Sequence, residues 1–280
     1  MIIDVHTHLF ARPVRQDRDA FFEGEPAFKS LYQAPNSRLV GAAELIEAMD
    51  QNGVERSVVF GFPWQNSDTF KCNNDYIMEV VARYPGRLLG FGCFDACHPM
   101  AAAEAERCLA ANLAGIGELA FYHSGPDERA IANLAPVMNI CRDKNVPVMI
   151  HTNEPVGHAY PGKSPNTLQQ IYRMVKRFAD NRLILAHWGG GLLFYGLLKK
   201  EVKKALANVF FDTAASPFLY DPEIYLVARQ IVGLDKVLFG SDYPLLPPDR
   251  YIEDMQRAGL TPAEIEAVCG GNALGLFYDR

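Results

Sequence analysis

The sequence predicts an α/β protein with a (β/α)8 fold, the TIM barrel. Three observations lead to this prediction. Short apolar segments rich in β-branched residues alternate with longer amphipathic segments, and this alternation favours a parallel sheet. Eight such units fit within the 280 residues, which matches the number of units and the usual size of the barrel. Several of the short segments end in a side chain that can bind a metal ion, and the carboxyl ends of barrel strands carry the catalytic residues.

The individual elements follow from the spacing of apolar residues, which alternate or run together in strands and recur every three to four positions in helices. We expect strands at 2–7, 54–60, 87–93, 114–119, 146–151, 182–187, 207–212 and 236–241. We expect helices near 41–52, 73–84, 99–112, 128–144, 166–179, 192–206, 221–232 and 248–258. An open, doubly wound sheet is the alternative, but it would not gather residues from strands 1, 4, 5, 6 and 8 around one point.

Two loops and the C-terminal segment depart from the repeat. A long loop, residues 10–40, follows the first strand, and residues 152–165, rich in proline and glycine, follow the fifth. Long loops at this end of a barrel are usually functional. The C-terminal helical tail begins with Thr261 as its N-cap, and we expect Gly270-Gly271 to break it.

Composition restricts the class of protein. With 49% hydrophobic and 21% charged residues the chain is globular, and we expect one domain over residues 1–280. The net charge of −6 argues against a broad nucleic-acid contact surface.

No apolar run approaches the roughly 18 residues of a membrane helix, and we expect no signal peptide. The six cysteines show no CxxC spacing, so we expect reduced thiols and a cytoplasmic location.

Five of the expected strands end in side chains that commonly bind metal ions. The candidate ligands are His6, His8, Glu118, His151, His187 and Asp242. Residues two apart in a strand point to the same face, so His6 and His8 are expected to project together. Asp4 lies on the same face one layer deeper, where it can anchor the floor of the site or orient a ligand.

The donor types indicate which ions the site would take. Neutral imidazoles and carboxylates suit zinc, manganese, iron or cobalt more than magnesium or calcium. We expect a divalent metal, with zinc favoured over manganese or iron, and one or two ions per chain.

These residues resemble the metal-dependent amidohydrolase superfamily. The motifs that carry the resemblance, in the superfamily's usual order, are Asp4-x-His6-x-His8, Ile150-His151, Ala186-His187 and Gly240-Ser241-Asp242-x-Pro244. The tail Gly271-Asn272-Ala273-Leu274-x-Leu276-Phe277 is similar to that of the amidohydrolase-related branch. That branch includes aminocarboxymuconate-semialdehyde decarboxylase, related aromatic-acid decarboxylases and lactone hydrolases.

The fourth strand decides between subtypes in this resemblance. Many superfamily members place a carboxylated lysine there, whereas this chain has Glu118, which looks like the bridging glutamate of TatD-type hydrolases. The mononuclear decarboxylases typically lack a ligand on this strand. The resemblance therefore favours hydrolysis and a two-metal centre, with Glu118 as an outer partner of the ligands as the alternative.

We accordingly expect a hydrolase that uses a metal-activated water on a small ester, lactone, amide or related bond. Asp242 would take the proton from that water and pass it to the leaving group, and His187 would polarise the substrate or handle a proton. The main alternative is a metal-dependent decarboxylase of an unsaturated or aromatic carboxylic acid. A TatD-like nuclease and a metal-binding protein without catalysis are weaker alternatives.

Substrate contacts are expected from the loops that follow the strands. The candidates are Arg12, Trp64, His123, Asn153, Tyr160, Trp188 and Tyr243. Arg12 could pair with a substrate carboxylate. We expect a small-molecule substrate, no nucleic-acid or membrane partner, and a homodimer as the oligomeric state.

Overall fold

The computed structural model describes residues 1–278, and its centre is a sheet of eight parallel strands in sequential order from β1 to β8. The strands are β1 (Ile2–His8), β2 (Val54–Phe60), β3 (Leu88–Gly92), β4 (Gly115–Leu119), β5 (Val148–Ile150), β6 (Leu183–Leu185), β7 (Val209–Asp212) and β8 (Val237–Leu238). Each expected strand is present, and several are shorter than expected because their last residues bend into the loops that carry the site.

The sheet closes on itself through the segment that follows β8. The amide of Val5 donates to the carbonyl of Phe239 at 2.9 Å, and the amide of Asp242 donates to the carbonyl of His6 at 3.0 Å. The amide of His8 in turn donates to the carbonyl of Tyr243 at 2.9 Å. The predicted (β/α)8 barrel is therefore confirmed, and its closure places Asp242 beside β1.

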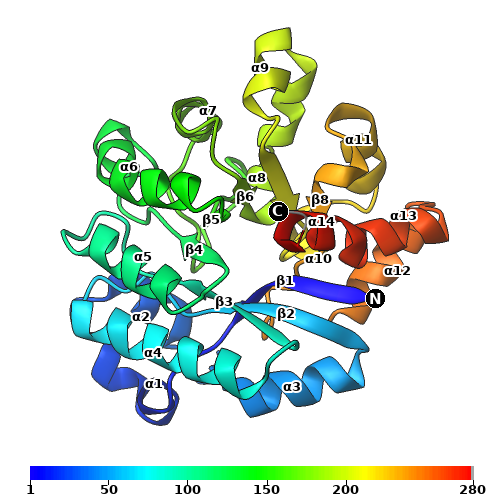
Figure 1. Ribbon diagram of the computed structural model, residues 1–280. Helices are drawn as coiled ribbons and strands as arrows, with labels where there is room; N and C mark the ends of the chain where they lie inside the picture. Colours follow the sequence, from blue (N-terminus) through cyan, green and yellow to red (C-terminus); the bar gives the residue numbers. More distant parts are fainter. Residues whose placement is uncertain (279–280) are drawn as a thin grey trace.

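Helices surround the barrel, as Figure 1 shows. The longer ones are α3 (Ala42–Gln51), α4 (Ser67–Arg83), α5 (Ala101–Ala110), α6 (Glu128–Asp143), α7 (Leu168–Arg177), α11 (Ile224–Ile231) and α12 (Asp249–Arg257). Short turns of helix lie among them: α8 (Ala186–Gly189), η2 (Leu192–Leu197), α9 (Lys200–Ala205), α10 (Ser216–Leu219) and η3 (Leu234–Lys236). Their apolar faces pack on the sheet, as Ile171, Met174 and Val175 of α7 do.

One expected helix, 192–206, is split into η2 and α9. Lys199 between them has an extended backbone, with φ −134° and ψ 154°. Gly196 in η2 packs so closely that a Cβ there would lie 2.7 Å from Ile231 of α11. The first helical segment therefore packs closely on α11, and the extended Lys199 separates it from the second.

The C-terminal tail closes the amino-terminal end of the barrel. It contains α13 (Pro262–Glu266), the π-helical turn η4 (Ala267–Gly271) and α14 (Asn272–Tyr278). Thr261 caps α13 as expected, but the expected break at Gly270-Gly271 is wrong, because the chain stays helical there. Gly270 instead allows a close approach, since a Cβ would lie 2.5 Å from the carbonyl oxygen of Met1. In Figure 1, α14 lies over the barrel axis.

The side chains of α14 complete a core inside the barrel. Leu276 and Phe277 pack with Val5, Phe91 and other inward-facing strand residues. This end of the barrel is therefore filled by apolar side chains, which leaves the carboxyl ends of the strands as the open end.

The long loop after β1 folds into three short helices, α1 (Arg12–Gln16), η1 (Arg18–Phe21) and α2 (Pro26–Tyr32). Arg18 fastens it internally, since its Nη1 donates to the carbonyls of Tyr32 at 3.1 Å and Ser37 at 2.7 Å. The buried carboxylate of Glu25 accepts from the amides of Gln65 and Asn66, each at 2.8 Å. The loop is thereby held against the segment that follows β2.

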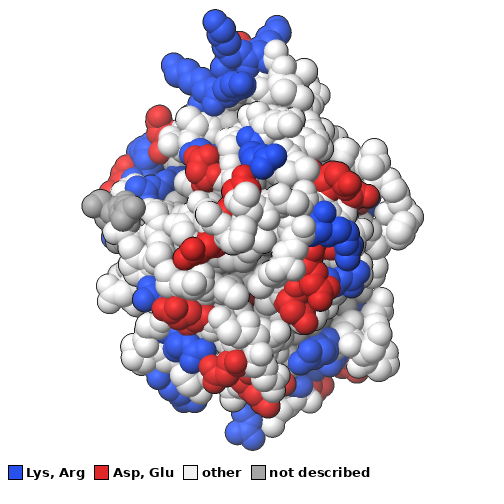
Figure 2. All heavy atoms as spheres, turned by 90° about the vertical axis from the view of Figure 1, so that its right-hand side faces the viewer, with Lys and Arg blue, Asp and Glu red and all other residues white. Residues whose placement is uncertain are grey.

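Charge is mixed over the face drawn in Figure 2, except at its top, where basic side chains gather. Figure 1 places α9 there, and the basic residues in and beside α9 are the exposed Lys199, Lys200, Lys203 and Lys204. Within residues 1–278, no helix is both long enough and apolar enough to span a membrane.

A buried carboxylate on α5, paired with an arginine of the same helix, provides a first stability prediction. Glu104 is 2% exposed, and it accepts from Asn74 Nδ2 at 2.8 Å and from Arg107 Nη2 at 2.7 Å. Replacing Arg107 by alanine leaves this carboxylate buried without its cation, so we expect the free energy of unfolding to fall by about 2–3 kcal/mol. Urea denaturation of the variant measures this change.

The matched control is Arg83→Ala, because Arg83 pairs with Glu79 at an exposed position on α4. Exposed pairs contribute little, so this variant should lose less than about 0.5 kcal/mol. Equal losses in the two variants would contradict the role given to burial.

Candidate metal centre

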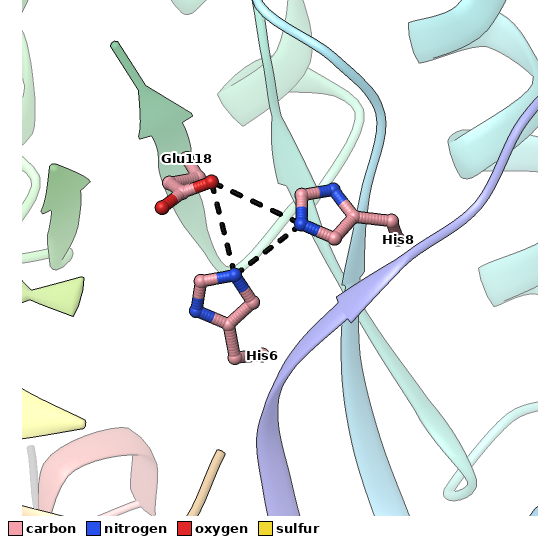
Figure 3. A group of neighbouring side chains, drawn as sticks. All are labelled: His6, His8 and Glu118. Atoms are coloured by element: carbon pink, nitrogen blue, oxygen red, sulfur yellow. Dashed lines mark hydrogen bonds and ion pairs between the residues drawn. The ribbon is translucent and has the colours of Figure 1, made fainter. Parts of the chain in front are cut away.

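All six candidate ligands lie at the carboxyl ends of the strands and face one another. His6 and His8 come from β1 and Glu118 from β4, and Figure 3 shows these three converging. The others follow β5, β6 and β8 directly or within a short turn: His151, His187 and Asp242. The expected gathering of these side chains is therefore present in the structure.

The first half of the cluster is built around the two histidines of β1. Their Nε2 atoms lie 3.3 Å apart. Glu118 Oε2 lies 3.7 Å from His6 Nε2 and 3.9 Å from His8 Nε2. Asp242 Oδ1 lies 3.5 Å and 3.3 Å from the same two nitrogens. Two imidazoles and two carboxylates thus face a common point.

The second half of the cluster uses the other oxygen of the same glutamate. Glu118 Oε1 lies 3.0 Å from His151 Nδ1 and 3.5 Å from His187 Nε2. Glu118 therefore stands between two histidine pairs and offers one oxygen to each. Gly117 permits this placement, since its φ is +136° and a Cβ there would lie 2.5 Å from the carbonyl of Met149.

The outer ring nitrogens of the β1 histidines are held by acceptors. His6 Nδ1 lies 2.9 Å from Asp212 Oδ2, and His8 Nδ1 lies 3.1 Å from the carbonyl oxygen of Gly61. Because a carboxylate or a carbonyl oxygen can only accept, each Nδ1 carries the proton. The Nε2 lone pairs are then left to face the cluster, which is the arrangement that metal-binding histidines require.

The same arrangement holds for the other two histidines. His187 Nδ1 lies 2.9 Å from the carbonyl oxygen of Ala214, and its Nε2 faces the cluster. His151 is turned the other way, with Nε2 3.1 Å from the carbonyl oxygen of Gly162 and Nδ1 facing Glu118. All four imidazoles therefore have one nitrogen fixed outward and one directed inward.

Asp212 at the end of β7 is a site residue that sequence reasoning missed. It is 0% exposed, and besides His6 it binds the backbone through Oδ1, which accepts from the amides of His187 at 2.8 Å and Ala214 at 3.1 Å. One buried carboxylate thus orients side chains from two strands. The expected strand 207–212 ends in this aspartate, so the criterion used for the other ligands could have found it.

Asp4 anchors the floor of the site, as expected. Its Oδ1 accepts from the amides of His6 at 3.1 Å and Ser241 at 2.9 Å, and its Oδ2 accepts from the Ser241 hydroxyl at 2.5 Å. These bonds join β1 to the residue before Asp242. Burial raises the pKa of Asp4 to about 6, although the hydrogen bonds from Ser241 and His6 oppose the rise.

Two candidate catalytic residues have left-handed backbones, with φ 56° at His187 and 61° at Asp242. Such a conformation is costly for residues other than glycine and persists only where the surroundings enforce it. Here the amide of His187 is bound by Asp212 and that of Asp242 by the carbonyl of His6. The bent backbone directs both side chains into the cluster.

The cluster is electrostatically coupled. Burial lowers the pKa of His6, but the carboxylates of Glu118, Asp212 and Asp242 outweigh it and raise the value to about 10. Burial also lowers the pKa of His187, and Glu118 and Asp242 raise it to about 9. Burial raises the pKa values of Glu118 and Asp242, but the facing histidines hold both well below the usual range. The carboxylates therefore hold protons on these imidazoles when no cation replaces them.

The donor set fits a divalent metal ion. Donor atoms from His6, His8 and Glu118, from His6, His187 and Asp242, and from Glu118, His151 and His187 lie within 4.8 Å of one another in each group. Ligands on metal–nitrogen bonds of about 2.0–2.1 Å at tetrahedral angles are about 3.3 Å apart, close to the distances above. Imidazole and carboxylate donors are also the types that such ions prefer.

Four of the seven expected substrate contacts are buried: Trp64, Trp188, Asn153 and Tyr243. Trp64 and Trp188 are 0% exposed, and the indole nitrogen of Trp188 donates to the Ser216 hydroxyl at 2.8 Å. Asn153 is buried and holds the loop after β5, where its Oδ1 accepts from the amide of Ser164 at 2.8 Å. These four side chains present little surface to a ligand in this structure.

The other three lie nearer the surface. Arg12 and His123 are exposed, and Tyr160 is half-buried with its hydroxyl donating to Glu154 Oε2 at 2.9 Å. None of the seven is among the donors that face one another in the cluster. Their roles as substrate contacts stay predictions.

Comparison with known proteins places the chain in a family. The sequence model of the Amidohydrolase family matches residues 3–278. A gamma-resorcylate decarboxylase of a Polaromonas species is 22% identical over an alignment 283 positions long. The alignment covers 83% of this chain and 86% of the relative. A 2-amino-3-carboxymuconate-6-semialdehyde decarboxylase of Dictyostelium discoideum is 26% identical over 252 residues, which cover 78% of this chain and 69% of the relative.

Solved structures share the fold over the whole chain. A dihydroxybenzoic acid decarboxylase from Polaromonas, with bound manganese and the inhibitor 2-nitroresorcinol, matches with a TM-score of 0.72 and 18% identity, covering 100% of this chain and 97% of that one. The 5-carboxyvanillate decarboxylase of Sphingomonas paucimobilis matches with a TM-score of 0.73 and 19% identity, covering 99% and 98%.

These relatives contradict the expected hydrolase and agree with the decarboxylase alternative. The expectation rested on Glu118, but a carboxylate between two histidine pairs describes how a cation would be held and not which bond breaks. The match over nearly all of the described residues, together with the fold, shows that this chain is an enzyme that belongs to the amidohydrolase family.

Proposed function

We propose that the protein is a metal-dependent decarboxylase of an aromatic or related unsaturated carboxylic acid. The observation that carries the proposal is that relatives matching most of the chain are named as decarboxylases of such acids. The cluster of imidazoles and carboxylates at the open end of the barrel supports it, because it offers both a cation site and groups that can carry a proton.

We propose that His6, His8 and Asp242 hold a divalent ion together with one oxygen of Glu118. The bound ion would supply Lewis-acid chemistry and hold the oxygens of the substrate. Zinc and manganese both suit this donor set. Zinc remains our prediction from the donor types, and manganese is supported by its presence in a solved neighbour.

The position of Glu118 between the two histidine pairs determines how many ions the cluster could hold. Its second oxygen faces His151 and His187, so one ion or two ions could be held in the cluster. Elemental analysis of protein purified without chelator distinguishes these states. About two ions per chain would make Glu118 a bridge, and about one would leave the second histidine pair for the substrate.

The reaction defines what the residues must do. The bond between the carboxylate and its carbon breaks, carbon dioxide leaves, and the electron pair that stays on the carbon takes up one proton. We assign transfer of that proton, which is taken from solvent, to Asp242, because its side chain is the most open of the coupled donors, at 16% exposed. Exclusion of water by a bound substrate raises the proton affinity of such a carboxylate. His187 presents Nε2 to the cluster and is assigned the hydrogen bond to the departing carboxylate.

A substrate screen tests the function. The ion-loaded protein is incubated with benzoic acids that carry hydroxyl or methoxy groups and with short unsaturated acids, and the products are separated by chromatography. We expect one group of acids to lose a carboxylate. A matched set of esters, lactones and amides is the control, and hydrolysis of that set without loss of any carboxylate would overturn the proposal.

Ion binding should depend on pH. His6, with a pKa of about 10 in the ion-free cluster, carries a proton on its inward nitrogen at neutral pH and must lose it to bind the ion. The affinity for the ion should therefore rise between pH 6 and 9, by about tenfold per pH unit for each proton released. Calorimetry in buffers of different ionisation enthalpy measures the protons released, and an affinity independent of pH would contradict the coupling.

Three further expectations stay predictions. They are the single domain over residues 1–280, the cytoplasmic location and the homodimer. A small-molecule substrate is consistent with the proposed reaction.

A further inference from the structure

An aromatic wall stands beside the metal centre. It consists of Tyr122, which follows β4, Phe62, which follows β2, and Tyr32, at the end of α2. The ring of Tyr122 lies 5.6 Å from that of His151 and stacks on Phe62 at 6.0 Å with an angle of 12° between the rings. The rings of Phe62 and Tyr32 are 6.3 Å apart. The aromatic wall thus runs from a candidate ligand to the long loop after β1.

The aromatic wall is supported from behind. The ring of Phe28 lies 4.8 Å from Tyr32, 5.4 Å from Phe62 and 4.3 Å from the buried Trp64. This packing fixes the orientation of the rings before any ligand binds. A rigid aromatic surface of this kind suits a planar ring, because stacking and apolar contact need little rearrangement.

The two tyrosine hydroxyls are not used by the protein. Within residues 1–278, neither the Tyr32 nor the Tyr122 hydroxyl takes part in a hydrogen bond, whereas the Tyr251 hydroxyl donates to the carbonyl of Ser241 at 2.6 Å. A phenol hydroxyl has an ordinary pKa of about 10, so both hydroxyls are protonated at neutral pH and can donate.

The cation beside Tyr32 already has partners. Arg18 Nη1 donates to the carbonyls of Tyr32 at 3.1 Å and Ser37 at 2.7 Å. A second carboxylate on the substrate would meet neutral hydroxyls here and gain no ion pair from them. The chemistry of the wall favours a neutral oxygen at this place.

We propose that the ring of the substrate lies against the aromatic wall at Tyr32 and Tyr122, its two partly exposed members, and that their hydroxyls bind a neutral oxygen substituent on it. The substrate is then a planar acid with one carboxylate and a hydroxyl, methoxy or carbonyl group, and not a dicarboxylate. This inference rests on the proposed function, because the carboxylate that is lost must face the metal centre while the ring lies on the wall.

Equilibrium binding tests the assignment. Calorimetry on manganese-loaded protein compares benzoate with its 3-hydroxy, 4-hydroxy and 3-carboxy derivatives. We expect a hydroxybenzoate to bind most tightly and the dicarboxylate most weakly. Tyr32→Phe and Tyr122→Phe should each reduce the preference for the hydroxyl group by about fivefold or more, the effect of one lost hydrogen bond. The affinity for benzoate should stay within about twofold, because phenylalanine keeps the ring.

The matched control is Tyr84→Phe, since Tyr84 lies at the end of α4, just before the amino end of β3 and away from the site. The preference of this variant for the hydroxyl group of the ligand should equal that of the wild type. An unchanged preference in both wall variants would overturn the inference, as would tightest binding of the dicarboxylate or no binding of any of these acids to the wild type.

The same preparations separate this inference from the proposed function. Release of carbon dioxide from an acid, with the hydroxyl preference unaffected by either substitution, overturns the inference alone. Selective binding that the substitutions abolish, without carbon dioxide release from any acid in the screen, overturns the function and leaves the inference on binding in place.

Discussion

Replacing Asp242 by asparagine is expected to lower kcat for carbon dioxide release by about 10³-fold, because the variant cannot deliver a proton to the substrate carbon. The fold should survive. Asparagine tolerates the left-handed backbone that Asp242 adopts, with φ 61°, and the amide that binds the carbonyl of His6 is unchanged. Steady-state kinetics and thermal denaturation measure the two effects.

Because Asp242 is also a proposed ligand, the ion content of the variant must be measured with its activity. A variant that keeps its ion and loses turnover supports the proton role, and one that loses both supports a ligand role. The matched control is Asp249→Asn, an exposed aspartate in the first turn of α12, which should leave both properties unchanged. Wild-type turnover in the Asp242 variant would refute its assignment.

The second large effect is expected at Asp212, which does not face the ion site but orients the residues that do. In Asp212→Asn, an amide NH2 can take the place of Oδ2, which lies 2.9 Å from His6 Nδ1. Two donors would then meet, so the imidazole is driven to the tautomer that carries its proton on Nε2 and has no lone pair for the ion. We expect the affinity for the ion to fall by 10- to 100-fold, roughly as for other partners of metal-binding histidines.

Competition with a chelator measures this affinity. Asp68→Asn, at the exposed start of α4, is the matched control and should bind the ion as the wild type does. The substitution at Asp212 should also lower turnover, because its Oδ1 holds the amide of His187. Unchanged ion affinity in the Asp212 variant would show that the tautomer of His6 is set by something else.

Much of the fold could be predicted because a barrel repeats one local pattern. Apolar residues at helical spacing identified α7, whose Ile171, Met174 and Val175 are buried as the pattern requires. The six candidate ligands could be grouped before the structure was known, since the carboxyl ends of parallel barrel strands meet at one rim. The split of 192–206 could not be predicted, because no local pattern marks the extended backbone of Lys199 that separates η2 from α9.

The details of the site depend on contacts between distant residues. His6 and Asp212 are 206 residues apart in the sequence and 2.9 Å apart in the structure, and no local pattern shows such a pair. Trp64 and Trp188 were expected to meet a substrate because they lie on loops, but these loops fold back and bury both indoles. The type of reaction could not be predicted from the sequence either, because the same metal-binding side chains serve several reactions in one fold.

Loss of a carboxylate as carbon dioxide is the reaction that we propose for this chain. The most direct measurement uses an acid identified by the screen, labelled with ¹³C in its carboxyl group, and follows labelled carbon dioxide against acid consumed. We expect one molecule of labelled carbon dioxide for each acid consumed, and no release after a chelator has removed the ion. Consumption of the acid with the label retained in a carboxyl-containing product would contradict it.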